Sequence, residues 1–149
     1  MRTADIPAGI LPGQRDLFYG GQWHPPVSGR YAETINPAYN EAIMSAAVAD
    51  ATDVDAAVRA AQAAFPGWAS TPPRKRGEYM RKAADALRVH AKELVLLDSL
   101  NNGNSVTALA HDVDFAIECL TYFSVLASEV KGETIPMGDG NLDFTVQEP

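Results

Sequence analysis

Apolar residues recur every three or four positions through most of the chain after residue 52, and this spacing predicts helices. Thr52 is the expected N-cap of a first helix, and Asp55 three residues later gives a variant of the capping box. Pro66-Gly67 should end that helix. Thr71 is the expected cap of a second helix that begins with Pro72-Pro73, because proline fits the first turn of a helix.

Two further helices are predicted in the second half of the chain. One runs from about residue 90 to 100 and ends at Asn101-Asn102-Gly103, residue types that tolerate left-handed backbone geometry. The other runs from about residue 105 to 130 and ends at Lys131-Gly132. The helical spacing predicts one shared apolar layer, formed by Val54, Val58, Ala61, Phe65, Met80, Ala84, Leu87, Val113, Ile117 and Leu120.

Extended segments are predicted on both sides of the helical region. The expected strands cover residues 17–19, 22–23, 31–35, 43–48 and 142–147. Gly20-Gly21 separates the first two strands and indicates a hairpin. Residues 134–140 are expected to form a loop, and residues 1–15, rich in proline and glycine, a flexible N-terminal arm.

The order of the elements is a few strands, then helices, then one strand. A doubly wound sheet would alternate strand and helix throughout. The pattern instead predicts an incomplete α/β fold, in which a layer of helices lies beside a sheet that has barely begun. A parallel strand at residues 142–147 would need further strands beside it.

The charge of the chain narrows the classes of partner. The net charge is −7 with a pI near 4.8, which argues against a general nucleic-acid or anionic-membrane binder. One basic cluster runs against this trend, at Arg74, Lys75, Arg76, Arg81, Lys82 and Arg88. We interpret it as a solvated helix face, and the alternative is a phosphate-contacting patch.

The cysteine count and the N-terminal residues bear on the cellular compartment. The single cysteine, Cys119, cannot form an internal disulfide, which favours a reducing compartment. The first residues do not resemble a signal peptide, and no run approaches the roughly 20 apolar residues of a membrane helix. We therefore expect a cytoplasmic protein.

The residues that most often perform chemistry do not form a recognisable active site. Cys119 lies within a predicted helix beside Glu118 and has no basic neighbour, so we expect an inert thiol. The three histidines lack the spacing of metal ligands, and they are His24, His90 and His111. The sequence has no G-x-G-x-x-G, no G-x-x-x-x-G-K-[ST] and no G-x-S-x-G motif. Gly138-Asp139-Gly140 is followed by no helix start and is predicted to be a turn.

Several short motifs occur together in an order that resembles the aldehyde dehydrogenase family. Residues 19–23 resemble its "GG-x-W" opening, and residues 33–37 its "x-T/V-x-NP" step. Residues 53–65 are similar to its "DVD-x-AV-x-AA-x-x-AF" helix, and residues 131–136 to its "G-x-T-I-P" segment. Further matches in the expected order are Trp68, Arg76, Leu97, Asn102-Gly103, Tyr122-Phe123 and Glu148-Pro149. The combined order over residues 17–149 is specific to that family.

The resemblance implies a Rossmann-type NAD-binding domain, a catalytic domain and an oligomerisation hairpin. Residues 16–149 would be the N-terminal portion, with part of the cofactor-binding domain. It also implies oxidation of an aldehyde to a carboxylic acid by NAD or NADP, through a thiohemiacetal on cysteine. The family's nucleophile, general base and phosphate-contacting turn have no counterpart here, and Cys119 lies in the wrong element. We therefore expect no catalytic and no cofactor-binding residue in this chain, which alone should be inactive.

One metal site is carried over from the resemblance. Thr34 and Ile35 match positions that contribute to a monovalent cation site in many members. The third family ligand is an aspartate, and Asn101 stands in its place, while Asn104 replaces the usual lysine. Because a cation site loses affinity when a negative ligand becomes neutral, we expect this site to be weak or empty.

Three functional hypotheses remain open from the sequence. The first is an aldehyde dehydrogenase segment: a truncated product, a fragment, or one piece of a split gene. The second is a non-enzymatic interaction module that associates with a full-length relative, either as a remnant or by self-association. The third is a DNA-associated helical protein, which the basic cluster favours and the overall acidity disfavours. Expected partners are therefore another copy or the rest of the enzyme, with no nucleic acid and no membrane.

Overall fold

The computed structural model describes residues 2–146 of the chain. Four helices make up its central part: α1 (Ala51–Ala69), α2 (Pro73–Val89), α3 (Ala91–Asn102) and α4 (Val106–Leu126). A short 3-10 turn, η1, covers Thr3–Asp5. The strands are β1 (Leu17–Tyr19), β2 (Gln22–His24), β3 (Tyr31–Asn36), β4 (Glu41–Ala47), β5 (Thr134–Ile135) and β6 (Asp143–Phe144).

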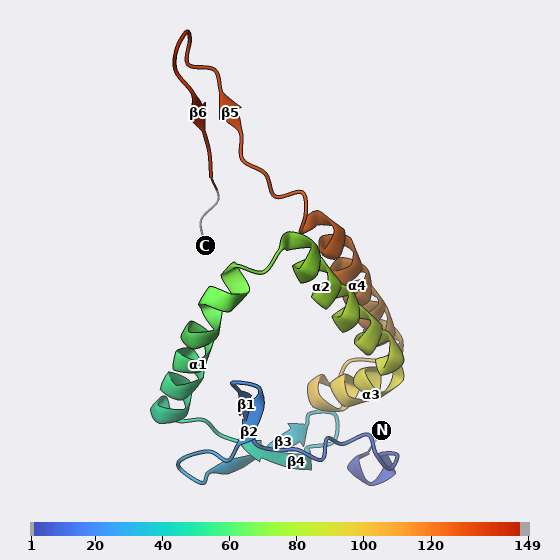
Figure 1. Ribbon diagram of the computed structural model, residues 1–149. Helices are drawn as coiled ribbons and strands as arrows, with labels where there is room; N and C mark the ends of the chain where they lie inside the picture. The colour runs from blue at the N-terminus through green and yellow to red at the C-terminus, as the bar shows by residue number, and fades with distance from the viewer. Residues whose placement is uncertain (1, 147–149) are drawn as a thin grey trace.

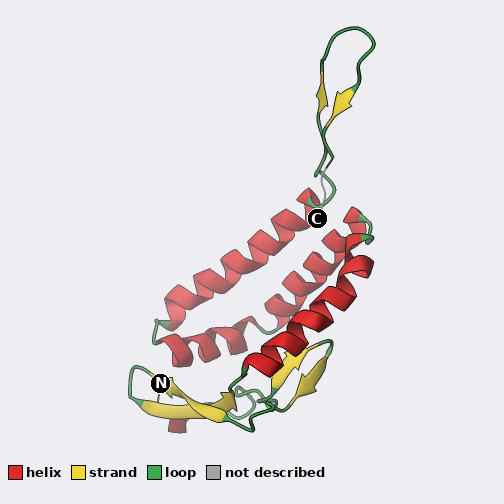
Figure 2. Cartoon of the chain, turned by 90° about the vertical axis from the view of Figure 1, so that its left-hand side faces the viewer, coloured by secondary structure: helices red, strands yellow, loops and turns green. Residues whose placement is uncertain are grey.

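The helices surround an open space rather than a closed core (Figure 1). α1 forms one side, α2 and α4 lie side by side on the other, and the first four strands close the base. The hairpin of β5 and β6 projects away from the helices in both views (Figures 1 and 2). Within residues 2–146, no helix has both the length and the apolar character needed to cross a membrane.

The strands form three separate antiparallel pairs, β1 with β2, β3 with β4, and β5 with β6. The hairpin predicted at Gly20-Gly21 is confirmed, and both glycines have positive φ angles. The β3–β4 register shifts between Thr34 and Ile35, which marks a bulge.

The C-terminal prediction was wrong in two respects. Residues 134–140 are not all loop, because β5 begins at Thr134, and β6 pairs with β5 rather than with a parallel sheet. Gly138 and Gly140 adopt positive φ and allow the chain to reverse between the two strands. Gln147, at the end of the predicted strand, and the Glu148-Pro149 motif lie outside the described residues.

The start of α1 also differs from the prediction. Asp50, not Thr52, is the N-cap, since its carboxylate accepts hydrogen bonds from the Thr52 and Asp53 amides. Asp53 accepts in return from the Asp50 amide and completes the capping box. Because the carboxylates of Asp50 and Asp53 cap the helix, it begins two residues earlier than a Thr52 cap would place it.

The boundary between α1 and α2 was misplaced as well. Pro66 lies inside α1, which continues to Ala69 because the Pro66 carbonyl still accepts the Ser70 N–H. Thr71 does not cap α2; its hydroxyl donates to the Gly67 carbonyl at 2.9 Å and so completes the end of α1. Pro72 is the N-cap of α2, without a side-chain hydrogen bond.

The last two helices follow the prediction more closely. α3 ends where expected, with Gly103 in left-handed geometry at φ 80°. Ser105 caps α4 through a hydrogen bond from the Ala108 amide. α4 ends at Leu126 rather than near residue 130, because the Ser128 and Glu129 amides bond to carbonyls only three residues back.

The packed part of the molecule lies where α2 and α3 meet α4. Gly77 of α2 is buried directly against the Ser124 carbonyl of α4, so the two helices are in close contact. Five buried side chains of the core belong to these three helices, and they are Ala84, Val95, Leu100, Leu109 and Ile117. The predicted layer is confirmed here, where Met80, Leu87, Val113 and Leu120 are half-buried and Ala84 and Ile117 buried.

The same prediction was wrong for α1. Val54, Val58 and Phe65 are 53%, 50% and 47% exposed, and Ala61 is exposed too. The spacing does place them on one helix, but this helix has few contacts with the other helices, one being Trp68 against Tyr79 of α2 (Figure 1). α1 is instead attached near its base, where the Val27 amide donates to Asp53.

Candidate functional site

The proposed cation ligands lie beside a hollow of about 490 Å³ next to α3 and the β3–β4 pair. Its walls are mostly apolar, and the residues lining it are Leu11, Pro12, Thr34, Ile43, Met44, Leu94, Leu97, Asp98, Asn101 and Val113. Thr34 comes from β3 just before the bulge, and Asn101 from the last turn of α3. Two residues that are 67 positions apart in the sequence are therefore brought to one hollow.

Ile35, the third residue carried over from the resemblance, does not line this hollow. It follows the bulge, pairs with Ala42 and is 41% exposed. The Thr34 hydroxyl donates to the Met44 carbonyl at 3.0 Å, so its proton is directed into the strand pair. The lone pairs of this hydroxyl oxygen remain available to a cation.

Asp98 is a polar residue of this hollow that the sequence reasoning missed. It lies three residues before Asn101, and helical spacing by itself puts the two on one face. Its carboxylate accepts a hydrogen bond from the Asn102 amide group at 3.0 Å. The polar groups lining the hollow are thus one hydroxyl, one amide and one carboxylate, and two of the three form hydrogen bonds within the chain.

The other candidate residues are dispersed. Cys119 is a half-buried free thiol on α4, with no hydrogen bond to a histidine among the described residues. His24 stacks on Tyr19 with ring centroids 4.0 Å apart, and His90 contacts Glu93 at 3.0 Å. No group of three or more His, Cys, Asp or Glu side chains within residues 2–146 could hold a metal ion.

The glycine turn and the first two helix N-termini lack the features of a dinucleotide phosphate site. Gly138 and Gly140 lie in the turn of the β5–β6 hairpin and do not precede a helix. The N-terminus of α1 already binds the Asp50 carboxylate in the place where it would attract an anion. The start of α2 has a proline at its first position and so offers one amide fewer.

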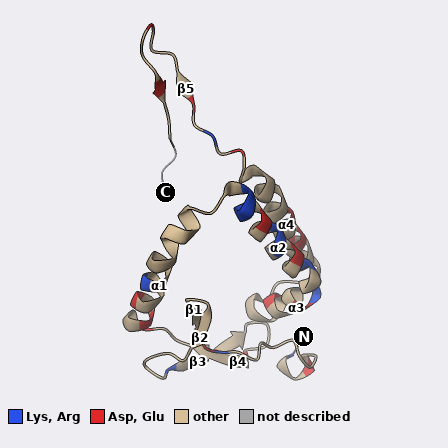
Figure 3. Ribbon diagram, in the orientation of Figure 1, with Lys and Arg blue, Asp and Glu red and all other residues tan. Residues whose placement is uncertain are grey.

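The basic cluster lies along α2, as the blue segments of Figure 3 show. Lys75 contacts Glu78 at 2.9 Å and Arg88 contacts Asp85 at 2.7 Å, both across one helical turn. The hydrogen bond and charge of Glu78 raise the pKa of Lys75, and Lys75 in turn lowers the pKa of Glu78. Such pairs are typical of a solvated helix face, the interpretation favoured from sequence.

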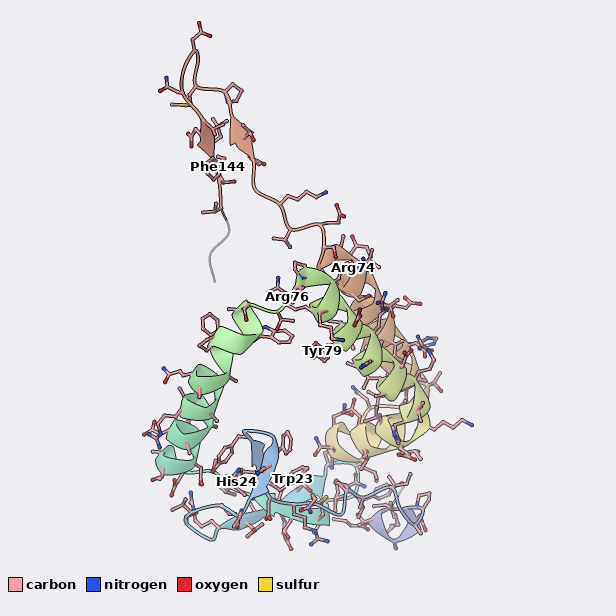
Figure 4. The ribbon with its side chains drawn as sticks, in the orientation of Figure 1. Trp23, His24, Arg74, Arg76, Tyr79 and Phe144 are labelled. Atoms are coloured by element: carbon pink, nitrogen blue, oxygen red, sulfur yellow. The ribbon has the colours of Figure 1, made fainter. Side chains whose placement is uncertain are left out.

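Arg76 differs from the rest of the cluster because it is half-buried. It lines a second hollow, of about 590 Å³, together with Trp68, Met80, Phe123, Leu126, Ala127 and Val130. Trp68 also lies against Tyr79, with ring centroids 6.1 Å apart. Figure 4 shows Arg76 and Tyr79 on the side of α2 that is turned toward α1.

A signal for Arg76 was present in the sequence. Residues 76, 80, 84 and 87 repeat at helical spacing, so Arg76 continues the apolar stripe of Met80, Ala84 and Leu87. Because Arg76 was grouped with the neighbouring charged residues, its place on the apolar stripe was not recognised from the sequence. The arginine is thus the one basic residue of the cluster that is half-buried and lines the hollow.

Comparison with known proteins gives one consistent family. The sequence model described as "Aldehyde dehydrogenase family" matches residues 23–149. The chain is 43% identical to aldehyde dehydrogenase tropH of Talaromyces stipitatus, over 93% of this chain and 28% of that protein. It is 36% identical to an aldehyde dehydrogenase of Aspergillus niger, over 99% of this chain and 30% of that protein.

Solved structures agree with the sequence matches. The fold is similar to that of an aldehyde dehydrogenase from Bacillus cereus in complex with NAD+, with a TM-score of 0.86 and 32% identity. That match covers 91% of this chain and 28% of the solved chain. The chain spans less than a third of the length of each of these relatives.

Proposed function

The chain belongs to the aldehyde dehydrogenase family, and we propose that it is the N-terminal part of an enzyme that oxidises an aldehyde to a carboxylic acid with NAD or NADP. The observation that carries this proposal is the match in fold, at a TM-score of 0.86, to a relative solved with NAD+. The agreement extends over 91% of this chain.

Within such an enzyme, this chain supplies structure rather than reacting groups. Thiol chemistry on a carbonyl needs a thiolate, an oxyanion donor and a base within reach of one atom. Cys119 lies within α4 beside Glu118, away from a helix N-terminus that would favour its thiolate. The isolated chain is therefore expected to be inactive and to bind NAD or NADP no better than another acidic protein.

The exposed apolar surface supports a role in association. On α1, Val54, Val58 and Trp68 are each about half exposed. The β5–β6 hairpin carries Leu142 and Phe144, which are 78% and 58% exposed. Surfaces of this kind are covered in stable proteins, here by the remaining polypeptide of the enzyme or by a second copy. The hairpin is the candidate for the oligomerisation element that the family resemblance implies.

The domain division, the compartment and the cation site complete the proposal. Residues 16–149 act as part of the cofactor-binding domain, with residues 1–15 as a flexible arm, in a cytoplasmic enzyme. The cation site at Thr34, Ile35 and Asn101 is weak. Sodium or potassium titration should show little binding to the wild-type chain, and Asn101→Asp should increase the affinity by adding a negative ligand. Tight binding to the wild type would contradict the proposal.

The main test is reconstitution of activity. The purified chain is mixed with NAD or NADP and a panel of aldehydes, and the reduced cofactor is followed by absorbance. We expect no turnover above a Cys119→Ala control, and turnover when a separately expressed C-terminal polypeptide of an aldehyde dehydrogenase is added. Turnover by the chain alone that is lost in Cys119→Ala would overturn the proposal.

A second function is favoured by the exposed face of α1, namely that of a non-enzymatic module that associates with full-length relatives. The same reconstitution separates the two. Stable association with a complete aldehyde dehydrogenase, without activity in any mixture with the C-terminal polypeptide, would support the interaction module.

A further inference from the structure

Arg76 combines a positive charge with an apolar environment. It is half-buried on α2, in the hollow it shares with Trp68, Met80 and Phe123. Trp68 and Phe123 are 50% and 53% exposed, so aromatic surface remains open beside the guanidinium. A desolvated guanidinium is stabilised when a carboxylate accepts its fixed, parallel donors.

No such carboxylate is supplied by the described chain. Arg76 takes part in no ion pair or side-chain hydrogen bond within residues 2–146. Glu78, the acidic residue next along α2, is bound to Lys75. Glu129, which follows α4, is bound to Lys131. The cation is therefore held in a partly dry site without its counter-charge, which lowers the stability of the isolated chain.

The apolar walls of the hollow and the charge of Arg76 together determine which chemical group would bind there. A hollow of about 590 Å³ has room for several side chains. Its lining holds a single cation among apolar residues, while Lys75 and Lys82 lie over the Tyr79 ring at 5.7 and 6.0 Å and do not line it. A phosphate has more charge and more acceptor oxygens, and it would lack hydrogen-bond donors there. One carboxylate would be bound by the guanidinium, and apolar side chains next to it would pack on the apolar walls.

We propose that the hollow around Arg76 receives an apolar segment carrying one carboxylate, contributed by the remaining polypeptide of the aldehyde dehydrogenase. This rests on the proposed function, in which the relatives extend to more than three times the length of this chain. Arg76 is then the residue that fixes the position of that segment against α2 and α4. It acts by recognition and takes no part in the reaction.

The chemistry of the hollow is tested on the full 149-residue chain with a small probe. Phenylacetate joins an aromatic ring to a carboxylate, and phenylacetamide is its neutral isostere. In a nitrogen-proton NMR titration, we expect the Trp68 indole signal to respond to phenylacetate at a concentration at least about fivefold lower than to phenylacetamide. Arg76→Met should abolish the preference, and Arg81→Met, on the exposed side of α2, should keep it.

The melting temperature shows whether the Arg76→Met chain is folded. Removal of an uncompensated cation from an apolar hollow should leave the melting temperature of the Arg76→Met chain equal to or above that of the wild type. Arg76→Gln provides a second neutral variant with a polar side chain. Equal responses to phenylacetate and phenylacetamide in the folded wild type would overturn the proposal.

The occupant is tested in the reconstituted assembly. Arg76→Met should weaken binding of the separately expressed C-terminal polypeptide by at least about tenfold, with Arg81→Met within about twofold of wild type. Equal binding by wild type and Arg76→Met would overturn the inference and leave the proposed function standing. Failure of the wild-type chain to bind at all would overturn the proposed function and this occupant with it. Self-association of the chain that Arg76→Met abolishes would assign the hollow to a second copy instead.

Discussion

α1 and α4 are helices of similar length, 19 and 21 residues, and both carry a regular apolar stripe. α4 uses its stripe against α2 and α3, with Leu109 and Ile117 buried. α1 leaves Val54, Val58 and Phe65 about half exposed. The difference teaches that helical spacing identifies which residues share a face, whereas burial depends on whether a second element is present to cover it.

Different contacts hold α4 and α1 in place. α2 and α4 approach closely because Gly77 has no side chain where the Ser124 carbonyl lies. α1 depends on its first turn, where buried Asp53 accepts hydrogen bonds from the Asp50 and Val27 amides at 3.0 and 3.1 Å. One helix is therefore held along its length, and the other mainly at its first turn, with Trp68 against Tyr79 near its C-terminal end.

The largest expected effect is a loss of core packing in α4. Leu109 is only 1% exposed, so Leu109→Ala should lower the free energy of unfolding by about 3 kcal/mol. Phe65→Ala removes a larger side chain from α1 but should lower it by less than about 1 kcal/mol, because Phe65 is already 47% exposed. Urea unfolding of the two variants measures both values. A greater loss for Phe65→Ala would show that α1 is packed in solution.

Glycine substitutions give the next contrast. A Cβ on Gly77 would fall onto the Ser124 carbonyl, so Gly77→Ala should force α2 from α4 and lower the free energy of unfolding by about 2 kcal/mol. Gly67 lies within α1 and a Cβ there would meet nothing within 4 Å. Gly67→Ala should therefore raise stability by about 0.5 kcal/mol through helix propensity. Thermal unfolding would contradict the comparison if the two shifts had the same sign.

The base of α1 gives a third, smaller effect. Asp53→Ala leaves two amides without their acceptor, and it should lower the free energy of unfolding by about 1.5 kcal/mol. Asp55→Ala, on an exposed position of the same turn, serves as the control and should change stability little. Hydrogen exchange should show the amides of Val27 and Asp50 losing protection in Asp53→Ala. Unchanged protection would mean that α1 is held by other contacts.

These contacts show how much of the fold the sequence could predict. The four helices, the first hairpin and the separate strands β3 and β4 follow from spacing and turn residues, which are local properties, whereas the pairing of β3 with β4 was not predicted. The capping role of Asp50 and the hydrogen bond from the Val27 amide to Asp53 are harder to predict from sequence. The first competes with a nearby threonine, and the second joins residues 26 positions apart.

The candidate sites show the same division. Thr34 and Asn101 were named together from a family resemblance, and the fold does bring them to one hollow. Asp98 and Arg76 were missed, although each lies at helical spacing from a residue already identified. Which face of a helix borders a hollow is a tertiary property, so it became visible only when the neighbouring elements were in place.

The smallest expected effect concerns Lys75–Glu78, one of two exposed ion pairs of α2 within residues 2–146, whereas α1 has none there. Lys75 lowers the pKa of Glu78, so the pair stabilises the fold above the usual pKa of a glutamate and loses this contribution as the pH falls through the lowered pKa. The raised pKa of Lys75 sets the other limit: its contribution is present below the usual pKa of lysine and is lost as the pH rises through the raised value. Glu78→Gln should therefore lower the melting temperature slightly at neutral pH and not at strongly acidic pH, because exposed pairs contribute little. Glu118→Gln, at an exposed residue of α4 without an ion pair among the described residues, serves as the control and should change the melting temperature little at neutral pH. An equal loss for Glu78→Gln at both pH values would mean that Glu78 acts through packing rather than through its charge.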